Sequence, residues 1–248
     1  MKIVLRNLSF GYAGKPIFNR LNTDFDSGGA GQPVVILGPS GSGKTTLLKL
    51  MGGLIKVQDG ELLFSDENGD GLVSGAPKTA FMFQEPRLLP WLTVLENVSL
   101  PLEKDLGKEE ARSKAGHFLS LVSLEDKRGA YPNELSGGEA QRVSMARAFA
   151  WPSPALFMDE PFQSLDIPLR LSLMDLAMSL LEKNNHFLVA VTHDPREAVY
   201  MAGRIIILGK PGEGIIFDRL VNLPAADRIY GAAAAVALEK EIIKVLRN

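Results

Sequence analysis

The chain has 248 residues, of which 27 are Lys or Arg and 29 are Asp or Glu, so its net charge is −2. Without a basic excess or a basic stripe, nucleic acid is not an expected partner. The absence of cysteine excludes disulfides and thiolate metal sites. Arg6 interrupts the N-terminal apolar stretch that a signal peptide needs, and no apolar run is long enough to span a bilayer. We therefore expect a cytoplasmic protein that is peripheral if it serves a membrane.

The first half of the chain opens with β-strands. Residues 2–26 alternate loosely between apolar and polar, with a Gly-Lys-Pro turn at 14–16, which predicts antiparallel strands. The apolar run 34–37 is short enough for a buried strand, and residues 46–51 suit a helix. The next expected elements are short strands at 61–64 and 79–83 and a helical stretch over 94–122 that is broken near 104–107.

The second half alternates between helix and strand. The predicted elements are a helix at 138–150, a strand at 155–158, a helix at 167–183, a strand at 187–192, a helix opened by Asp194 and Pro195 with Glu197 in the capping-box position, a hairpin of 205–208 with 215–217, and a helix at 232–246. This alternation predicts an α/β fold whose mostly parallel sheet carries helices on both faces. Since no linker separates independent domains, we expect one domain over residues 1–248.

A glycine-rich segment between the strand at 34–37 and the following helix fits the phosphate-binding loop pattern. Its glycines let several N–H groups point at one anion, and the helix start adds a favourable dipole. Lys44 can then reach the β- and γ-phosphates of a nucleoside triphosphate, and the Thr45 hydroxyl can hold Mg²⁺. The predicted nucleotide-binding residues of this loop are Gly38, Pro39, Ser40, Gly41, Ser42, Gly43, Lys44, Thr45 and Thr46.

Two acids follow the predicted strand at 155–158. At the carboxyl end of a parallel strand beside the phosphate loop, Asp159 would hold Mg²⁺ through water, and Glu160 would orient or deprotonate the attacking water. A second anion site is indicated at the start of a predicted helix, where backbone N–H groups and a hydroxyl come together. The residues of this second site are Ser136, Gly137 and Gly138.

Together with Gln84, Asp166 and His193, these motifs follow one another in an order that resembles an ATP-binding cassette (ABC) subunit along essentially the whole chain. The resemblance implies a P-loop NTPase core, an N-terminal antiparallel β-subdomain and a helical arm at about 87–150 that carries the signature, Ser136 to Gly138. It also implies that Tyr12 stacks on adenine, that Gln84 senses Mg²⁺ and the membrane partner, and that His193 contacts the γ-phosphate. From the residues alone, Tyr12 could equally be a core aromatic, Gln84 an ordinary polar residue and His193 a surface histidine.

The same resemblance implies that ATP joins two copies of the chain head to tail. In this family the signature of one subunit closes on the γ-phosphate of the other, and Asp166 would link the two sites. ATP would favour the closed pair and ADP would not. The prediction is therefore a homodimeric ATPase that uses ATP and Mg²⁺, with Mg²⁺ held by Thr45, Gln84 and Asp159. Its predicted catalytic residues are Glu160, His193, Lys44 and Gln84.

The segment 84–94 is similar to that of bacterial importer ATPases of the nitrate, sulfonate, taurine and thiamine-pyrimidine type, in which Leu-Leu-Pro-Trp follows the glutamine. Leu88, Leu89 and Trp91 offer an apolar surface for a short helix of a membrane subunit, or else they pack the core of the helical arm. The resemblance implies a membrane permease and an extracytoplasmic solute-binding protein as partners, at the cytoplasmic face of the inner membrane. The alternatives are a non-transport ABC ATPase acting on a soluble assembly, a small-molecule kinase, which leaves the signature unexplained, and a GTPase, which lacks its Asn-Lys-x-Asp motif.

Two residues depart from the family pattern. Glu139 stands where glutamine is more frequent, and Gln163 stands where small residues are more usual. Gln163 is expected to alter contacts across the dimer. Because every group needed for hydrolysis is present, we expect an active ATPase.

Overall fold

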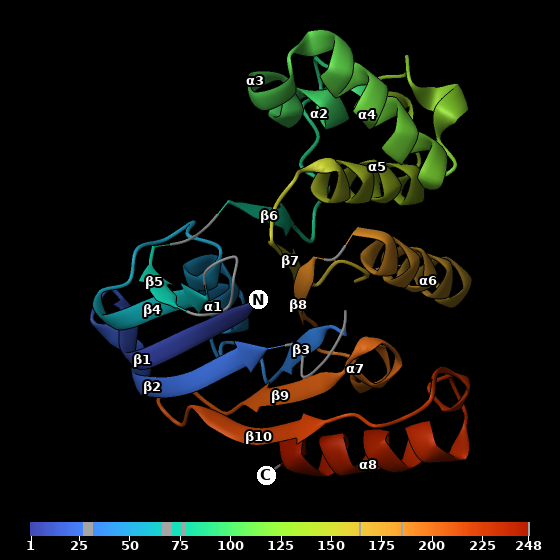
Figure 1. Cartoon of the computed structure of the whole chain (residues 1–248). Coiled ribbons are helices and arrows are strands. Elements are labelled where there is room, and N and C mark those ends of the chain that lie inside the picture. The colour runs from blue at the N-terminus through green and yellow to red at the C-terminus, as the bar shows by residue number, and fades with distance from the viewer. Residues whose placement is uncertain (27–31, 66–70, 76–77, 164, 185, 248) are drawn as a thin grey trace.

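A computed structural model of the chain describes residues 1–26, 32–65, 71–75, 78–163, 165–184 and 186–247 (Figure 1). The strands are β1 Lys2–Tyr12, β2 Lys15–Asp26, β3 Val34–Leu37, β4 Asp59–Ser65, β5 Leu72–Ser74, β6 Thr79–Met82, β7 Ala155–Asp159, β8 Phe187–Val191, β9 Arg204–Leu208 and β10 Ile215–Leu220. The α-helices are α1 Lys44–Met51, α2 Val94–Ser99, α3 Glu103–Leu106, α4 Lys108–Leu121, α5 Gly137–Ala150, α6 Ile167–Asn184, α7 Pro195–Met201 and α8 Ala233–Arg247.

The central sheet has the strand order β10-β9-β3-β8-β7-β6. Its strands pair in parallel except for β10, which runs antiparallel to β9 at the edge. The predicted mostly parallel sheet is therefore confirmed. Since β3, β7 and β8 run in the same direction, the segments that follow them, beginning at Gly38, Glu160 and Thr192, emerge at one edge of the sheet.

A second, antiparallel sheet has the order β2-β1-β4-β5 and contains the two N-terminal strands that the sequence predicts. The turn between β1 and β2 lies at Ala13 and Gly14, which both have positive φ, slightly before the predicted turn. Strand β5 was not predicted, because Leu72–Ser74 is short, exposed and set in a polar connection without a clear alternation.

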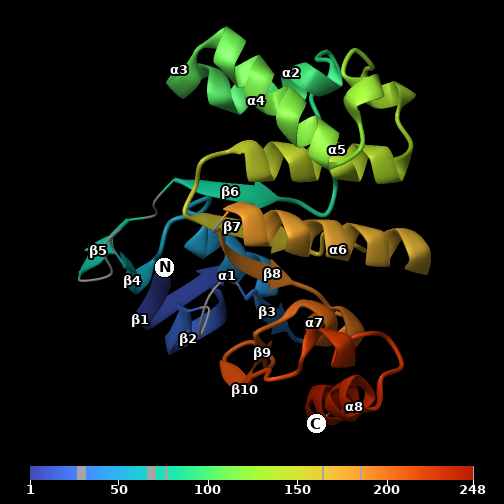
Figure 2. The same ribbon diagram turned by 45° about the vertical axis from the view of Figure 1, so that its right-hand side comes forward.

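Alternate residues of the central strands face two different cores. In β3, Val34 and Ile36 join α1 and the antiparallel sheet, whereas Val35 and Leu37 join the core that includes α5 to α8. This alternation follows from the two-residue period of a strand. Figures 1 and 2 show the consequence: α1 and the antiparallel sheet lie against one face of the central sheet, and α5, α6, α7 and α8 lie against the other.

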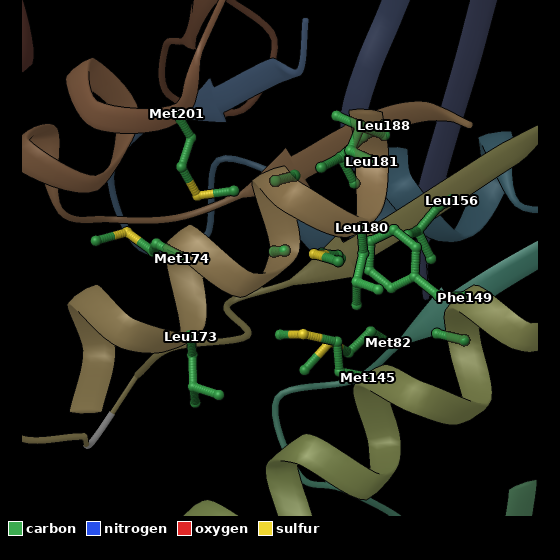
Figure 3. Packing of buried hydrophobic residues seen from close by; sticks show 14 of the residues in the cluster. Met82, Met145, Phe149, Leu156, Leu173, Met174, Leu180, Leu181, Leu188 and Met201 are labelled. Carbon is green, nitrogen blue, oxygen red and sulfur yellow. The ribbon is translucent and has the colours of Figure 1, made fainter. Parts of the chain in front are cut away.

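The core on the face covered by α5 to α8, called the second core below, contains methionine side chains where several elements meet (Figure 3). Met82 from β6, Met145 from α5, Met174 from α6 and Met201 from α7 are each at most 2% exposed. Phe149 of α5 packs into the same cluster. The flexible, polarizable thioether fills irregular gaps between elements that cross at different angles.

Helices α2 and α4 pack on α5 on the side away from the antiparallel sheet, and α3 packs on α4 (Figures 1 and 2). The predicted break near 104–107 falls between α3 and α4 at Gly107, whose φ of 77° suits glycine. None of the helices in the described ranges is both long enough and apolar enough to cross a bilayer.

One predicted local contact is wrong. Asp194 does cap α7, but its side chain accepts from Arg196 N, and Glu197 does not return to the cap. The Glu197 carboxylate instead accepts a hydrogen bond from the Thr192 hydroxyl and lies 3.4 Å from Arg170. The capping box is therefore replaced by a buried polar cluster.

Candidate active site

The phosphate loop joins β3 to α1, and Lys44 is the first residue of the helix. The Lys44 ammonium folds back on the loop and donates to the carbonyls of Gly38, at 2.9 Å, and Pro39, at 3.1 Å. Burial lowers the pKa of Lys44, while the nearby carboxylates of Glu160 and Asp159 act in the opposite direction. The remaining loop residues of the prediction, Ser40, Gly41, Ser42, Gly43, Thr45 and Thr46, lie on the same turn into α1.

A side chain at Gly43 would be strained and would force the neighbouring residues of β2 to shift. The φ of Gly43 is 96°, and an added Cβ would lie 2.4 Å from Ile17 Cγ2 and 2.8 Å from Phe18 Cζ. The strand β2 thus packs directly on the phosphate loop. Sequence reasoning missed Ile17, because an apolar residue in a strand carries no sign that it will border a polar cavity.

Thr45 and Asp159 are brought into contact by the parallel sheet. The Thr45 hydroxyl donates to Asp159 Oδ1 at 2.8 Å, although the residues are 114 positions apart. Burial raises the pKa of the Asp159 carboxyl above its usual value, partly offset by this hydrogen bond. A hydroxyl and a carboxylate in contact are hard oxygen donors, which is the ligand type that Mg²⁺ prefers.

Glu160 follows β7 in a left-handed backbone conformation, with φ of 47°. Its N–H donates to the Val191 carbonyl at 2.9 Å, which ties it to the end of β8. Its Oε2 lies 3.1 Å from His193 Nδ1, and the His193 side chain is 55% exposed. The structure therefore brings the predicted Glu160 and His193 together.

Gln84, just after β6, reaches the same region by way of Gln163. Gln84 Nε2 donates to Gln163 Oε1, and Gln163 N donates to the Glu160 carbonyl at 3.2 Å. Gln163, one of the two residues that depart from the family pattern, thus contacts Gln84 within its own chain. This pairing was not foreseen from the sequence, which pointed only to contacts across the dimer.

A cavity of about 300 Å³ opens at the phosphate loop. It is lined by Ile17, Ser40, Gly41, Gly43, Lys44, Thr45, Thr46 and Glu160. Tyr12 is 49% exposed and meets Phe10 edge to face at 5.0 Å between ring centroids. Tyr12 is therefore not a core aromatic, and its ring has a free surface.

The signature residues open α5. The Ser136 hydroxyl accepts from Glu139 N at 3.3 Å, and Glu139 Oε2 accepts from Ser136 N at 2.8 Å, so the departing Glu139 completes a capping box. Gly137 and Gly138 form the first turn of the helix. Within the described residues none of these three lines the cavity at the phosphate loop, and the N-terminal end of α5 lies away from α1 in Figures 1 and 2.

Asp166 is exposed at the start of α6, where its Oδ1 accepts from Leu169 N at 2.9 Å. Ser164, two residues before Asp166, lies outside the described residues. The carboxylate of Asp166 thus has a local role as a helix cap and is also open to a partner.

The segment after Gln84 is fixed by side chains from the helical arm. Arg147 of α5 donates to the carbonyls of Pro86, at 2.7 Å, and Arg87, at 3.0 Å. The buried Asn97 bonds both the N–H and the carbonyl of Leu89. Leu88 packs against the second core, but Trp91 is 70% exposed. The alternative that Trp91 belongs to the core is therefore wrong.

The comparisons with known proteins agree with this geometry. A family model described as ABC transporter matches residues 20–163, more than half of the chain. The chain belongs to the ABC transporter family. The predicted resemblance and the predicted ABC ATPase are confirmed, and the comparisons do not favour a non-transport role.

Two similar relatives of this ABC protein are named as aliphatic sulfonates import ATP-binding protein SsuB. That of Rhodopseudomonas palustris (strain BisA53) is 38% identical over 246 residues, which cover 99% of this chain and 83% of the relative. That of Shigella sonnei (strain Ss046) is 36% identical over 247 residues, which cover 99% of this chain and 91% of the relative.

A solved structure of an ATP-binding cassette, a dimeric post-hydrolysis state bound to ADP and Pi, has a TM-score of 0.75 to this chain. The two sequences are 32% identical, and the match covers 90% of this chain and 100% of the other. The likeness confirms the predicted P-loop NTPase fold.

Proposed function

We propose that this ABC protein is the ATP-hydrolysing subunit that powers import of a small solute through a membrane-embedded permease. The ATP-hydrolysing role is carried by one observation, the contact of Thr45 with Asp159 directly beside the buried Lys44 on the phosphate loop. Relatives along nearly the whole chain are named for the import of aliphatic sulfonates, which are therefore the first solutes to test.

ATP would bind with its phosphates against the N–H groups of residues 38–46. Lys44 would exchange its bonds to the Gly38 and Pro39 carbonyls for phosphate oxygens, which return the electrostatic stabilisation lost on burial. Mg²⁺, when bound with ATP, neutralises phosphate charge, and Thr45, Asp159 and Gln84 are the residues that would hold it. The exposed ring of Tyr12 would stack on adenine.

Hydrolysis would use Glu160 and His193 as a hydrogen-bonded pair. Glu160 would orient the attacking water and accept its proton, while His193 would contact the γ-phosphate. The Gln163 link would bring Gln84 to the turn that carries Glu160, so that the metal side and the water side of the site move together.

A second copy of the chain would complete the site. Ser136, Gly137 and Gly138 lie outside the chain's own nucleotide cavity, so the N–H groups of Gly137 and Gly138 in the first helical turn are available to the γ-phosphate held by the partner copy. Asp166, exposed at the start of α6, would face that partner. ATP would then stabilise the closed homodimer, and hydrolysis would release it.

The permease would dock beside the exposed Trp91, on the segment that Arg147 and Asn97 hold in place. We assign the chain to the cytoplasmic face of the cell membrane, where an extracytoplasmic solute-binding protein would deliver the solute to the other side of the permease. This arrangement links solute delivery to the Gln84 segment and so to the ATP site.

The test is to recover tagged protein from native membranes in mild detergent and to identify its partners by mass spectrometry. An integral membrane subunit is expected with the unaltered chain and should be lost with Trp91→Ala. It should be kept with the control Ile229→Ala, which removes an apolar side chain of similar exposure elsewhere on the surface. Recovery of soluble partners alone would contradict the import proposal.

A further inference from the structure

A partly buried arginine outside the nucleotide cavity joins two functional segments. Arg170, in the first turn of α6, has a side chain that is only 16% exposed. Its Nη2 donates to the Leu165 carbonyl at 3.1 Å, and its Nη1 donates to Asp194 Oδ2 at 3.0 Å. The same Nη1 lies 3.4 Å from Glu197 Oε1. One guanidinium therefore holds α6, the segment before it and the start of α7 in a fixed arrangement.

Each end of this bridge lies next to a residue of the proposed site. Leu165 directly precedes Asp166, which is exposed and for which we propose contact with the partner copy. Asp194 directly follows His193, and its N–H donates to the Thr192 hydroxyl at 3.1 Å. Thr192 in turn donates to Glu197. His193 thus stands between two residues whose side chains belong to the Arg170 cluster.

The chemistry of the cluster favours arginine over lysine. Burial raises the pKa of Glu197 because it disfavours the charged carboxylate, and the positive charge of Arg170 acts in the opposite direction. The planar guanidinium can serve a carbonyl and two carboxylates at once, whereas an ammonium group presents a single point charge. Removing Arg170 would leave two carboxylates without their shared partner and would free the Leu165 carbonyl.

We propose that Arg170 is a positioning residue that couples the Leu165–Asp166 segment to His193, so that contact with a second copy at Asp166 fixes the imidazole against the γ-phosphate. The inference rests on the proposed function of Asp166 and His193. Arg170 itself lines no part of the nucleotide cavity within the described residues. Its effect therefore reaches the reaction through His193 and not through ATP.

Arg196 provides a matched control. Its guanidinium binds the same Asp194 carboxylate at 3.2 Å and 3.1 Å, but from the exposed side. Its hydrogen bonds within the described part of the chain all go to Asp194, so Arg196→Met removes one cation from Asp194 and keeps the bridge to Leu165. Arg170→Met removes the bridge.

The first measurement is the NMR spectrum of the histidine ring protons without nucleotide. The chain has three histidines, and His193→Gln identifies the signal of His193. Arg170→Met is expected to shift or broaden that signal and to leave His117, on the helical arm, unchanged. Arg196→Met should have a clearly smaller effect. An unchanged His193 signal in Arg170→Met would overturn the proposal.

The second measurement separates binding from turnover. Arg170→Met should lower kcat at least about tenfold while the Kd of ATP for the single chain changes less than about threefold. In combination with Asp166→Ala its effect on kcat should be less than additive, whereas Arg196→Met should add independently. Full additivity of Arg170→Met with Asp166→Ala would contradict the coupling.

Two controls keep the test decisive. If Arg170→Met fails to fold because Glu197 is left unpaired, Arg170→Met/Glu197→Gln removes both charges and still lacks the Leu165 bond, so it should reproduce the His193 effect. If the unaltered chain hydrolyses no ATP, the proposed function fails. The nucleotide-free spectrum still decides whether Arg170 positions His193.

Discussion

Glu160 Oε2 and His193 Nδ1 lie 3.1 Å apart, although 33 positions separate these residues in the chain. The contact arises because β7 and β8 are parallel neighbours in which Asp159 pairs with Val191, so the residues that follow them leave the sheet together. The left-handed backbone of Glu160, tied to the Val191 carbonyl, fixes the remaining geometry. A strained backbone of this kind is retained only where the surrounding contacts hold it in place, and such positions cluster at functional sites.

Lys44→Ala is expected to weaken ATP binding at least about tenfold, or ~1.4 kcal/mol, because it removes the buried cation closest to the phosphates. Fluorescence titration with an ATP analogue measures the loss. Lys56→Ala, which removes an exposed lysine beyond α1, is the control and should bind normally. Equal affinities for the two variants would contradict the assigned role of Lys44.

Asp159→Asn is expected to stabilise the nucleotide-free chain at neutral and higher pH. Burial raises the pKa of Asp159, so the folded chain holds this proton more tightly than the unfolded chain. The stabilisation that this proton contributes is present below the unfolded pKa of about 3.9 and is lost as pH rises through the folded pKa. Asparagine keeps an acceptor for Thr45 and carries no charge.

Urea unfolding at two pH values checks this expectation. The midpoint of Asp159→Asn should exceed that of the unaltered chain at about pH 8, and the gain should shrink towards pH ~4. The same variant should lose Mg²⁺-dependent ATP hydrolysis, since stability and function oppose each other at such a site. A gain independent of pH would show that charge burial is not its cause.

Trp91→Ala should leave the melting temperature within about 2 °C of the unaltered chain and spare basal hydrolysis, because the side chain is 70% exposed. It should remove stimulation of hydrolysis by the permease and solute-binding protein in reconstituted vesicles. Leu88→Ala is the contrasting variant, since Leu88 packs against the core and should cost about 1–2 kcal/mol of stability. Unfolding of Trp91→Ala, or its full stimulation, would exclude the proposed docking role.

Gln163→Ser should raise the Mg²⁺ concentration needed for half-maximal hydrolysis, by about threefold or more if the bond to Gln84 is worth a typical hydrogen bond. The reason is that Gln163 fixes the Gln84 amide with its nitrogen engaged and its oxygen free for the metal. Binding of Mn²⁺ with ATP, followed by electron paramagnetic resonance, gives a readout that does not depend on turnover. Binding of metal-free ATP should stay unchanged, and equal metal affinity in both proteins would refute the link.

Much of the site was predictable because its functional residues lie in short sequence segments with recognisable patterns. The phosphate loop, the acids after the strand at 155–158 and the histidine after the strand at 187–192 each follow an apolar run, and parallel strands bring such positions to one edge. The boundaries of β3 were predicted as observed, since a short apolar run is bounded by proline and glycine.

What the sequence left out depends on packing between distant elements. Ile17 reaches the phosphate loop only because the antiparallel sheet covers one face of the central sheet. Glu197 stands in a capping-box position, but its carboxylate contacts the partly buried Arg170 and the buried Thr192 instead of the backbone at the helix start. Local spacing cannot reveal such competition, because the competing partners lie on other elements.

The most direct test of the account is the mass of Glu160→Gln, measured by size-exclusion chromatography with light scattering in the presence of ATP. Glutamine keeps the shape of the side chain but cannot accept the proton of the attacking water. We expect a dimer that forms with ATP, that is absent with ADP, and that is lost when Ser136→Arg blocks the start of α5. A Glu160→Gln protein that stays monomeric at saturating ATP would contradict the account of an ATP site completed by a second copy.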